Sequence, residues 1–171
     1  MNTKKHQDHP HLSGEHKYGD LGQVILLLLF LAVWITDSFL FHYSTFLIDM
    51  VPDYIRITLA GLVLIAAWIL VRTGIRTVFG TERSEPELIT TGVFSIVRHP
   101  IYTGALLFCV GSSLITMSLA SAGCCVSLGF FYYMISRYEE RILKEEFGND
   151  YLNYSRKVGM MFPKLPVRSG R

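Results

Sequence analysis

The sequence has no Asp, Glu, Lys or Arg between Ile101 and Ser136, a stretch of 36 residues. Charge is also scarce from Leu21 to Phe41, where Asp37 is the one charged residue. A helix needs about 20 predominantly apolar residues to cross a hydrocarbon core about 30 Å thick, so these uncharged stretches exclude an ordinary soluble domain. Half of all residues are hydrophobic and they occur in blocks, which indicates an integral membrane protein.

Cysteine is scarce too. Cys109, Cys124 and Cys125 lie in apolar segments, where cysteines behave as small hydrophobic residues and predict neither a disulfide framework nor a metal site. Residues 1–20 are polar and lack apolar periodicity, so we predict a mobile tail. The spacing of its histidines fits no fixed coordination pattern, and no metal is predicted there. These histidines are His6, His9, His11 and His16.

Four membrane spans are predicted. The first is Leu21–Phe41, and the second runs from about Tyr54 to Arg72 with a basic helical extension to Phe79. The uncharged stretch 101–136 would make a continuous helix of about 54 Å, so it must fold back. The small, polar residues 117–123 predict the turn, leaving two spans of about 16 residues each. Small residues are expected to let these last two spans pack closely, namely Gly111, Ser112, Ser113, Gly123, Ser127 and Gly129.

Positive charge lies almost entirely on one side of such a bundle. The tail, the 72–98 segment and everything after Ser136 share that side and hold 15 of the 16 Lys and Arg residues, with only Arg56 opposite. The positive-inside rule therefore predicts that both termini are cytoplasmic, in the inner membrane of a cell. Asp37, near the far end of the first span, is expected at headgroup level or in a capping role.

A charged loop meets the third span at an Arg-His-Pro element. His99 occupies the position of a helix cap, and Pro100 suits the first helical position because an N–H there would lack a partner. The free N–H groups of this helix start, next to Arg98, would suit a carboxylate or phosphate. Tyr102 and Gly104 add an aromatic face and a point where a ligand can approach the backbone. The alternative is a plain helix start with Arg98 among lipid headgroups.

Residues 137–157 are predicted to form a helix after the fourth span, with a break at Gly148-Asn149. Counting three- and four-residue steps places Glu139 on a buried face, whereas Glu140 aligns with Lys144 as an i, i+4 pair. A buried carboxylate needs a partner, which Arg98, Arg137 or a bound ligand would supply. The face consists of Glu139, Leu143, Phe147, Tyr151, Tyr154 and Val158.

Two ordered motifs resemble the isoprenylcysteine carboxyl methyltransferase family, which is related to the phospholipid N-methyltransferases. The first is Arg98-His99-Pro100-Ile101-Tyr102-Thr103-Gly104. After about 35 residues of hairpin the second follows, Glu139-Glu140-x-x-Leu143-x-x-x-Phe147-Gly148-x-x-Tyr151-x-x-Tyr154-x-x-x-Val158, and then Pro163. The resemblance covers roughly residues 88–165. The chain departs from the family at 92–94, where Gly-Pro-Tyr is frequent, and at 159–162, where a polar or basic residue is common.

The resemblance implies a membrane-embedded methyltransferase that binds S-adenosyl-L-methionine on the cytoplasmic side. Glu139 or Glu140 would hold hydroxyls or the ammonium of this cofactor, and the two arginines would orient carboxylates. The implied catalytic residues are Arg98, Arg137 and Glu140. The implied cofactor-binding residues are His99, Pro100, Tyr102, Gly104, Glu139, Glu140 and Tyr151.

The predicted fold is therefore all-α, a polytopic membrane protein with four transmembrane helices, including a helical hairpin, and a C-terminal cytoplasmic or interfacial helix. Three regions are expected: the cytoplasmic tail at 1–20, two spans at 21–79 and a cofactor-binding core at 80–171. Methyl transfer to a carboxylate or thiolate needs no general base, so a dry site that holds donor and acceptor in place suffices.

The predicted acceptor is lipophilic, the carboxylate of an isoprenylated cysteine or a similar isoprenoid acid, which would enter laterally between spans. A phospholipid amine or a small thiol is the alternative acceptor. Membrane lipids are expected partners and nucleic acid is not, while the oligomeric state is not predicted. Three other classes compete: an NADPH-dependent membrane reductase, a small four-span transporter and a non-catalytic assembly protein. A transporter should carry an ionisable residue mid-bundle, and a reductase more basic residues for phosphates.

Overall fold

The computed structural model describes residues 17–80 and 87–164. The predictions for the histidines of the tail and for 81–86 of the loop lie outside the described residues. Within the described ranges the regular secondary structure is helical, apart from one isolated parallel bridge between Val97 and Gly159. The helical elements are α1 (Lys17–Ile35), η1 (Thr36–Phe41), η2 (Phe46–Met50), α2 (Asp53–Phe79), η3 (Gly92–Ser95), α3 (Pro100–Thr116) and α4 (Leu119–Lys157).

Three described helices are long and apolar enough to cross a membrane: Gly22–Phe41, α2 and α4. The predicted all-α integral membrane fold is thereby confirmed. The helix α3 is apolar as well but has 17 residues, about 26 Å of helix, which is less than the thickness of a typical hydrocarbon core. Many large apolar side chains on α1, α2 and α4 are exposed, as expected for helices that face lipid.

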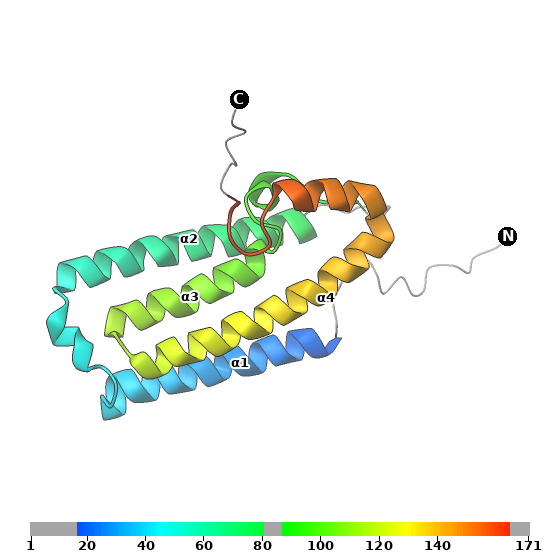
Figure 1. Ribbon diagram of the computed structural model, residues 1–171. Coiled ribbons are helices and arrows are strands. Elements are labelled where there is room, and N and C mark those ends of the chain that lie inside the picture. Colours follow the sequence, from blue (N-terminus) through cyan, green and yellow to red (C-terminus); the bar gives the residue numbers. More distant parts are fainter. Residues whose placement is uncertain (1–16, 81–86, 165–171) are drawn as a thin grey trace.

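The four long helices lie side by side in the order α2, α3, α4, α1 and alternate in direction (Figure 1). The turn between α3 and α4 is shorter than predicted, because only Met117 and Ser118 lie outside the helices. Met117 adopts the left-handed conformation, and the Ser118 hydroxyl caps α4 by accepting a 3.1 Å bond from Ser121 N.

Asp37 joins two connections at this end of the bundle; it caps none of the described helices, and its expected place at headgroup level stays a prediction. Its carboxylate accepts hydrogen bonds from the backbone N–H of Ser44 at 3.0 Å and from the hydroxyls of Ser44 and Ser118, each at 2.5 Å. Trp34 also donates to Thr116 at 3.0 Å. The two turns on this side of the bundle are therefore tied together.

Two glycines of α3, Gly104 and Gly111, bring this helix against α2. Ser113 and Gly129 do lie between α3 and α4 as predicted, because the Ser121 hydroxyl donates to Ser113 at 2.7 Å and a Cβ on Gly129 would lie 3.7 Å from Leu106. A Cβ on Gly111 would lie 2.8 Å from the side chain of Leu64, so the expectation that Gly111 packs the last two spans together is wrong. The buried small residues of α2 recur every seven positions, at Ala60, Ala67 and Gly74. Gly104 and Gly111 have the same spacing, and the two rows form a close seam.

The helix α4 bends at Gly148, where the backbone torsions φ 51° and ψ −120° interrupt the helix at the predicted break. Residues 119–147 run the length of the bundle. Residues 149–157, here called the cap segment, turn back across its end, next to the start of α3 (Figure 1). Positive φ favours glycine, which explains the residue at this position.

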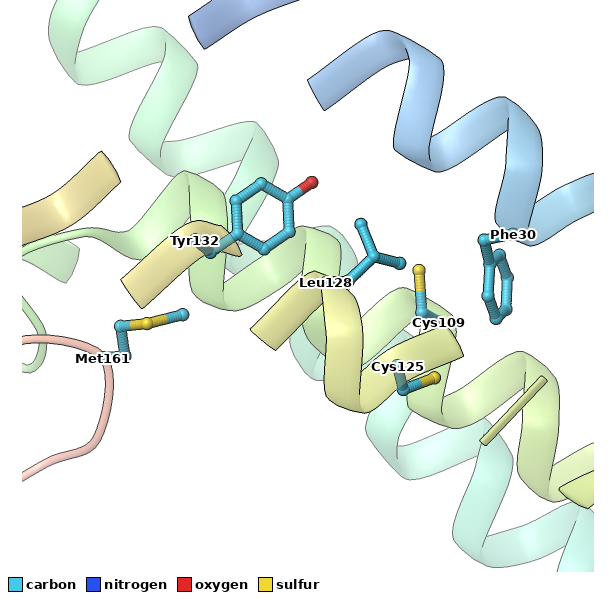
Figure 2. Packing of buried hydrophobic residues seen from close by; sticks show 6 residues of the cluster. All are labelled: Phe30, Cys109, Cys125, Leu128, Tyr132 and Met161. Carbon is cyan, nitrogen blue, oxygen red and sulfur yellow. The ribbon is translucent and has the colours of Figure 1, made fainter. Parts of the chain in front are cut away.

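An apolar cluster fills the space between α1, α3 and α4. Its buried members are Phe30, Cys109, Cys125, Leu128, Tyr132 and Met161 (Figure 2). All three cysteines are free, consistent with their expected behaviour as small hydrophobic residues. Met161 follows the cap segment, so the chain after α4 reaches back to the core beside Tyr132.

Candidate functional site

The loop before α3 lies against residues 158–162, here called the strap. Arg98 N donates to Gly159 O at 2.9 Å, and His99 N donates to Met160 O at 3.1 Å. The hydroxyl of Thr103 adds a 3.2 Å bond to Met161 O. A Cβ on Gly159 would lie 1.8 Å from Phe162 O, so the tight turn of the strap requires glycine. These bonds fix the Arg-His-Pro element against the end of α4.

Arg98 and Glu140 form a buried ion pair. Arg98 Nε lies 2.8 Å from Glu140 Oε1, and Nη2 donates to the same oxygen. Nη1 donates to two backbone carbonyls, Ser155 O at 2.8 Å and Val158 O at 2.7 Å. The side chain of Arg98 is 10% exposed and that of Glu140 is 9% exposed. Arg98 is thus the partner that the buried carboxylate requires.

His99 lies between both glutamates. Its Nδ1 is 3.2 Å from Glu139 Oε2, and its Nε2 is 3.7 Å from Glu140 Oε1. Burial by itself lowers the pKa of His99, but the close contact with Glu139 and the negative charges of Glu139 and Glu140 outweigh it and raise the pKa above its usual 6.5. The imidazole is therefore held toward its protonated form.

Three stacked rings connect this polar cluster to the apolar one. The rings of His99 and Tyr102 have centroids 5.7 Å apart with a 6° interplanar angle, and those of Tyr102 and Tyr132 are 5.4 Å apart at 9°. The Tyr102 hydroxyl donates to Glu139. Because Tyr132 belongs to the apolar cluster, charged groups and an apolar core meet at Tyr102.

The predicted ranking of the two glutamates by burial was wrong. Glu140 is the more buried one and binds Arg98 rather than lying on a solvated face with Lys144, while the side chain of Glu139 is 16% exposed. The spanning part of α4 buries Tyr132, Ser136 and Glu140 at four-residue steps. The predicted face was counted through Gly148, where the kink changes the phase, so it selected the neighbouring residue. Continuing the period forward from the fourth span would have found Glu140.

The other predicted site residues fall in different places. Pro100 is buried at the first position of α3, and Tyr151 is fully buried within electrostatic reach of Glu140. Arg137 is exposed. The expected ligand approach at Gly104 is not what the structure shows, because a Cβ there would lie 2.6 Å from the side chain of Val71. The space beside Gly104 is filled by α2.

Several residues of this site were not predicted from the sequence. Thr103, Met161 and Tyr132 join the cluster through the contacts above, and the carbonyls of Ser155 and Val158 bind Arg98. Thr103 and Val158 belong to the two motifs, and Tyr132 had a sequence signal because it lies two turns before Glu140 on the same helix face.

Three buried polar atoms of the described residues have no hydrogen-bond partner: His99 Nε2, Ser136 Oγ and Tyr151 Oη. Ser136 lies one helical turn before Glu140, and the other two residues are close to that carboxylate. Buried polar groups are nearly always hydrogen-bonded, because leaving one unpaired costs about 1–3 kcal/mol. A polar ligand or water next to Glu140 would supply these partners.

The phospholipid methyltransferase family matches residues 55–150, which is more than half of the chain. The matched region includes the whole first motif and the second motif as far as Gly148. The chain belongs to this family. The resemblance to the isoprenylcysteine carboxyl methyltransferases that the motifs indicated is thereby confirmed, and Arg98, His99, Glu139 and Glu140 all lie within the matched region.

Individual relatives agree with this assignment. The chain is 37% identical over 73 residues to protein-S-isoprenylcysteine O-methyltransferase B of Arabidopsis thaliana, covering 42% of this chain and 37% of that protein. It is 33% identical over 89 residues to cobalt-zinc-cadmium resistance protein CzcN of Cupriavidus metallidurans, covering 52% of this chain and 41% of that protein. The matched regions thus span about two fifths of these relatives.

The fold is also similar to that of a solved membrane protein, the eukaryotic intramembrane Ras methyltransferase ICMT (isoprenylcysteine carboxyl methyltransferase). The TM-score is 0.55 at 21% sequence identity, and the match covers 92% of this chain and 54% of that chain. At 21% identity this likeness shows a shared fold and no more.

Proposed function

We propose that this protein is an integral membrane methyltransferase that uses S-adenosyl-L-methionine and acts on a lipophilic acceptor, the carboxylate of an isoprenylated cysteine or a similar isoprenoid acid. One observation carries the proposal: the Arg-His-Pro and Glu-Glu motifs, about 40 residues apart, meet in one buried cluster in a chain of this family. Their meeting point contacts an apolar core through Tyr102 and Tyr132, which suits a polar donor and a lipophilic acceptor.

The residues of the cluster fit S-adenosylmethionine. The unpartnered atoms His99 Nε2 and Tyr151 Oη offer hydrogen bonds to its hydroxyls or amino-acid group, and the carboxylate of Glu139 is an acceptor for its hydroxyls or ammonium. Tyr102 stacks on His99 and donates to Glu139, so it holds both of these ligand-binding candidates in place. When bound, the cofactor supplies a methyl group on a positively charged sulfur.

The protein's own residues have to orient the acceptor and exclude water. A carboxylate acceptor is already nucleophilic, so no general base is needed, and positioning in a dry site provides the acceleration. We propose Arg137 for orienting the acceptor carboxylate, because it is exposed one turn before Glu140 at the same end of the bundle. Glu140 holds its place through Arg98 and contributes its charge to His99.

We further propose a four-span topology in which α3 crosses the membrane with the other helices, both termini are cytoplasmic and the membrane is the inner one. On this arrangement residues 21–79 supply two spans and residues 80–171 the cofactor-binding core. The acceptor reaches the cluster laterally, from lipid, past the apolar residues that surround Tyr132. A short α3 leaves the start of that helix near the lipid boundary, which supports such a route.

The experiment is transfer of labelled methyl from S-adenosylmethionine to a panel of lipophilic acids, thiols and amines by the purified protein in detergent. Isoprenoid acids are expected to be methylated best. Each buried methylene contributes about 0.8 kcal/mol, so removing one five-carbon unit should weaken apparent affinity at least about tenfold after correction for partitioning. A flat response to chain length, or faster turnover of small water-soluble thiols, would contradict the lipophilic acceptor.

Substitutions test the cofactor residues, with binding of S-adenosylmethionine as the measurement. His99→Ala, Tyr102→Ala and Glu139→Gln should each weaken binding of S-adenosylmethionine by about 1–3 kcal/mol, the usual loss for one partner in a buried polar site. Glu146→Gln is the matched control, since Glu146 is an exposed carboxylate on the same helix. Equal binding by Glu139→Gln and Glu146→Gln would exclude Glu139 from the cofactor site.

A further inference from the structure

The hydrogen bonds of Arg98 bear on what this residue recognises. An arginine side chain has five N–H donors. In this structure Nε and Nη2 bind Glu140, and Nη1 binds two backbone carbonyls, Ser155 O and Val158 O. Four donor contacts are therefore made within the protein. The side chain is only 10% exposed, so little of the guanidinium faces outward.

The partners of Arg98 lie on opposite sides of the bend in α4. Glu140 precedes Gly148, whereas Ser155 and Val158 follow it, in the last helical turn and just beyond. The last carbonyls of a helix lack intrahelical donors, and a cation there also interacts favourably with the helix dipole. Lys164 donates to the same Ser155 carbonyl at 2.8 Å, so this helix end is held by two cations.

A second contact holds the cap segment in the same place. The Tyr154 hydroxyl donates to Phe94 O at 2.6 Å, which connects the segment to the loop before α3. The cap segment also carries Tyr151, which is fully buried beside Glu140 and Arg98. The angle at Gly148 is thus set by groups on the loop, with Arg98 at their centre.

We infer that Arg98 is a positioning residue that clasps the cap segment and strap over the cluster and sets Glu140, and that it does not bind the carboxylate of the cofactor. This inference rests on the proposed function of the site. It leaves the more exposed Glu139, with His99 and Tyr102, as the ligand-facing groups. It also gives the two adjacent glutamates different roles, because Glu140 is engaged by Arg98 and Glu139 is not.

The test compares S-adenosylmethionine with its decarboxylated analogue, which lacks only the carboxylate. Binding of both is measured by calorimetry for the wild type, Arg98→Ala and the milder Arg98→Lys, with Arg141→Ala as an exposed control on α4. A clasp predicts that each Arg98 variant weakens both ligands by the same factor, within about threefold. A loss at least tenfold larger for the ligand that carries the carboxylate would overturn the inference.

Thermal unfolding provides a readout that does not depend on the cofactor. Breaking a buried ion pair is expected to lower the Tm by about 5–15 °C. Arg98→Ala and Glu140→Gln should each do so, and the double variant should be little worse than either single one, because they remove the same interaction. Additive Tm shifts in the double variant, or an unchanged Tm in Arg98→Ala, would overturn the positioning role of Arg98. If the wild type binds neither ligand, the proposed function fails while the unfolding result still decides the role of Arg98.

Discussion

His99 is buried between two carboxylates, and its pKa is raised relative to the usual 6.5. A histidine whose pKa is raised in the folded state adds stability that is fully present below the unfolded pKa and is lost as the pH rises through the folded pKa. We therefore predict that His99→Gln lowers the Tm more at about pH 6 than at about pH 9. The measurement is thermal unfolding of both proteins across this range.

A matched control for this pH dependence is His42→Asn. His42 is exposed and has φ 54°, a conformation that asparagine tolerates well. Its substitution should change the Tm little at any pH. A stability difference between wild type and His99→Gln that stays constant, or grows with pH, would show that His99 is not held protonated by Glu139 and Glu140.

At the scale of elements, the seam between α2 and α3 gives the next prediction. A Cβ on Gly104 would lie 2.6 Å from Val71 Cγ2 and 2.9 Å from Ala67 O, so Gly104→Ala must push the helices apart. Such overpacking costs about 1–3 kcal/mol. Gly61 on α2 has nothing within 4 Å of an added Cβ, and Gly61→Ala should be neutral or stabilising by up to about 1 kcal/mol.

Unfolding of the two alanine variants, with and without S-adenosylmethionine, separates packing from ligand binding. Packing at Gly104 predicts a lower Tm in both conditions and a similar shift of Tm on adding cofactor in variant and wild type. An unchanged Tm together with weaker cofactor binding would instead support the approach of a ligand to the backbone at Gly104.

At the scale of the whole molecule, the structure places the connections at two opposite ends. The 42–52 connection and the turn between α3 and α4 share one end, since Leu119 N donates to Ser44 O and Arg56 donates to Ile115 O. The loop before α3 and the strap share the other end. Because ten of the eleven Lys and Arg residues that the structure describes belong to the second end, and only Arg56 to the first, we predict that the second end is cytoplasmic.

Cysteine labelling in intact cells tests this orientation. Single cysteines introduced at 46–50, and at Leu119 or Ala120, should react with a membrane-impermeant reagent from outside. Cysteines at 87–91 should react only after lysis. Cys109, Cys124 and Cys125 lie within helices, and a variant that lacks them is the control for background labelling. External labelling at 87–91 would invert the topology.

Much of the fold followed from the sequence, because it depends on residues close together in the chain. The absence of charge located the apolar helices, Pro100 marked the start of α3, and Gly148 marked the bend in α4. Both motifs were also visible. Each of these features is local, since helix starts, breaks and spans are set by residues within about one to five turns of one another.

Only the tertiary structure decided which residues meet. Arg98 binds Glu140 and two carbonyls 57 and 60 residues away, and Gly104 packs against α2. The choice between Glu139 and Glu140 depended on the phase of α4 where it packs on α3, which a count through the kink at Gly148 cannot preserve. Such contacts depend on how whole helices pack against one another. The apolar period of one helix shows which face is buried but does not show which other helix covers that face.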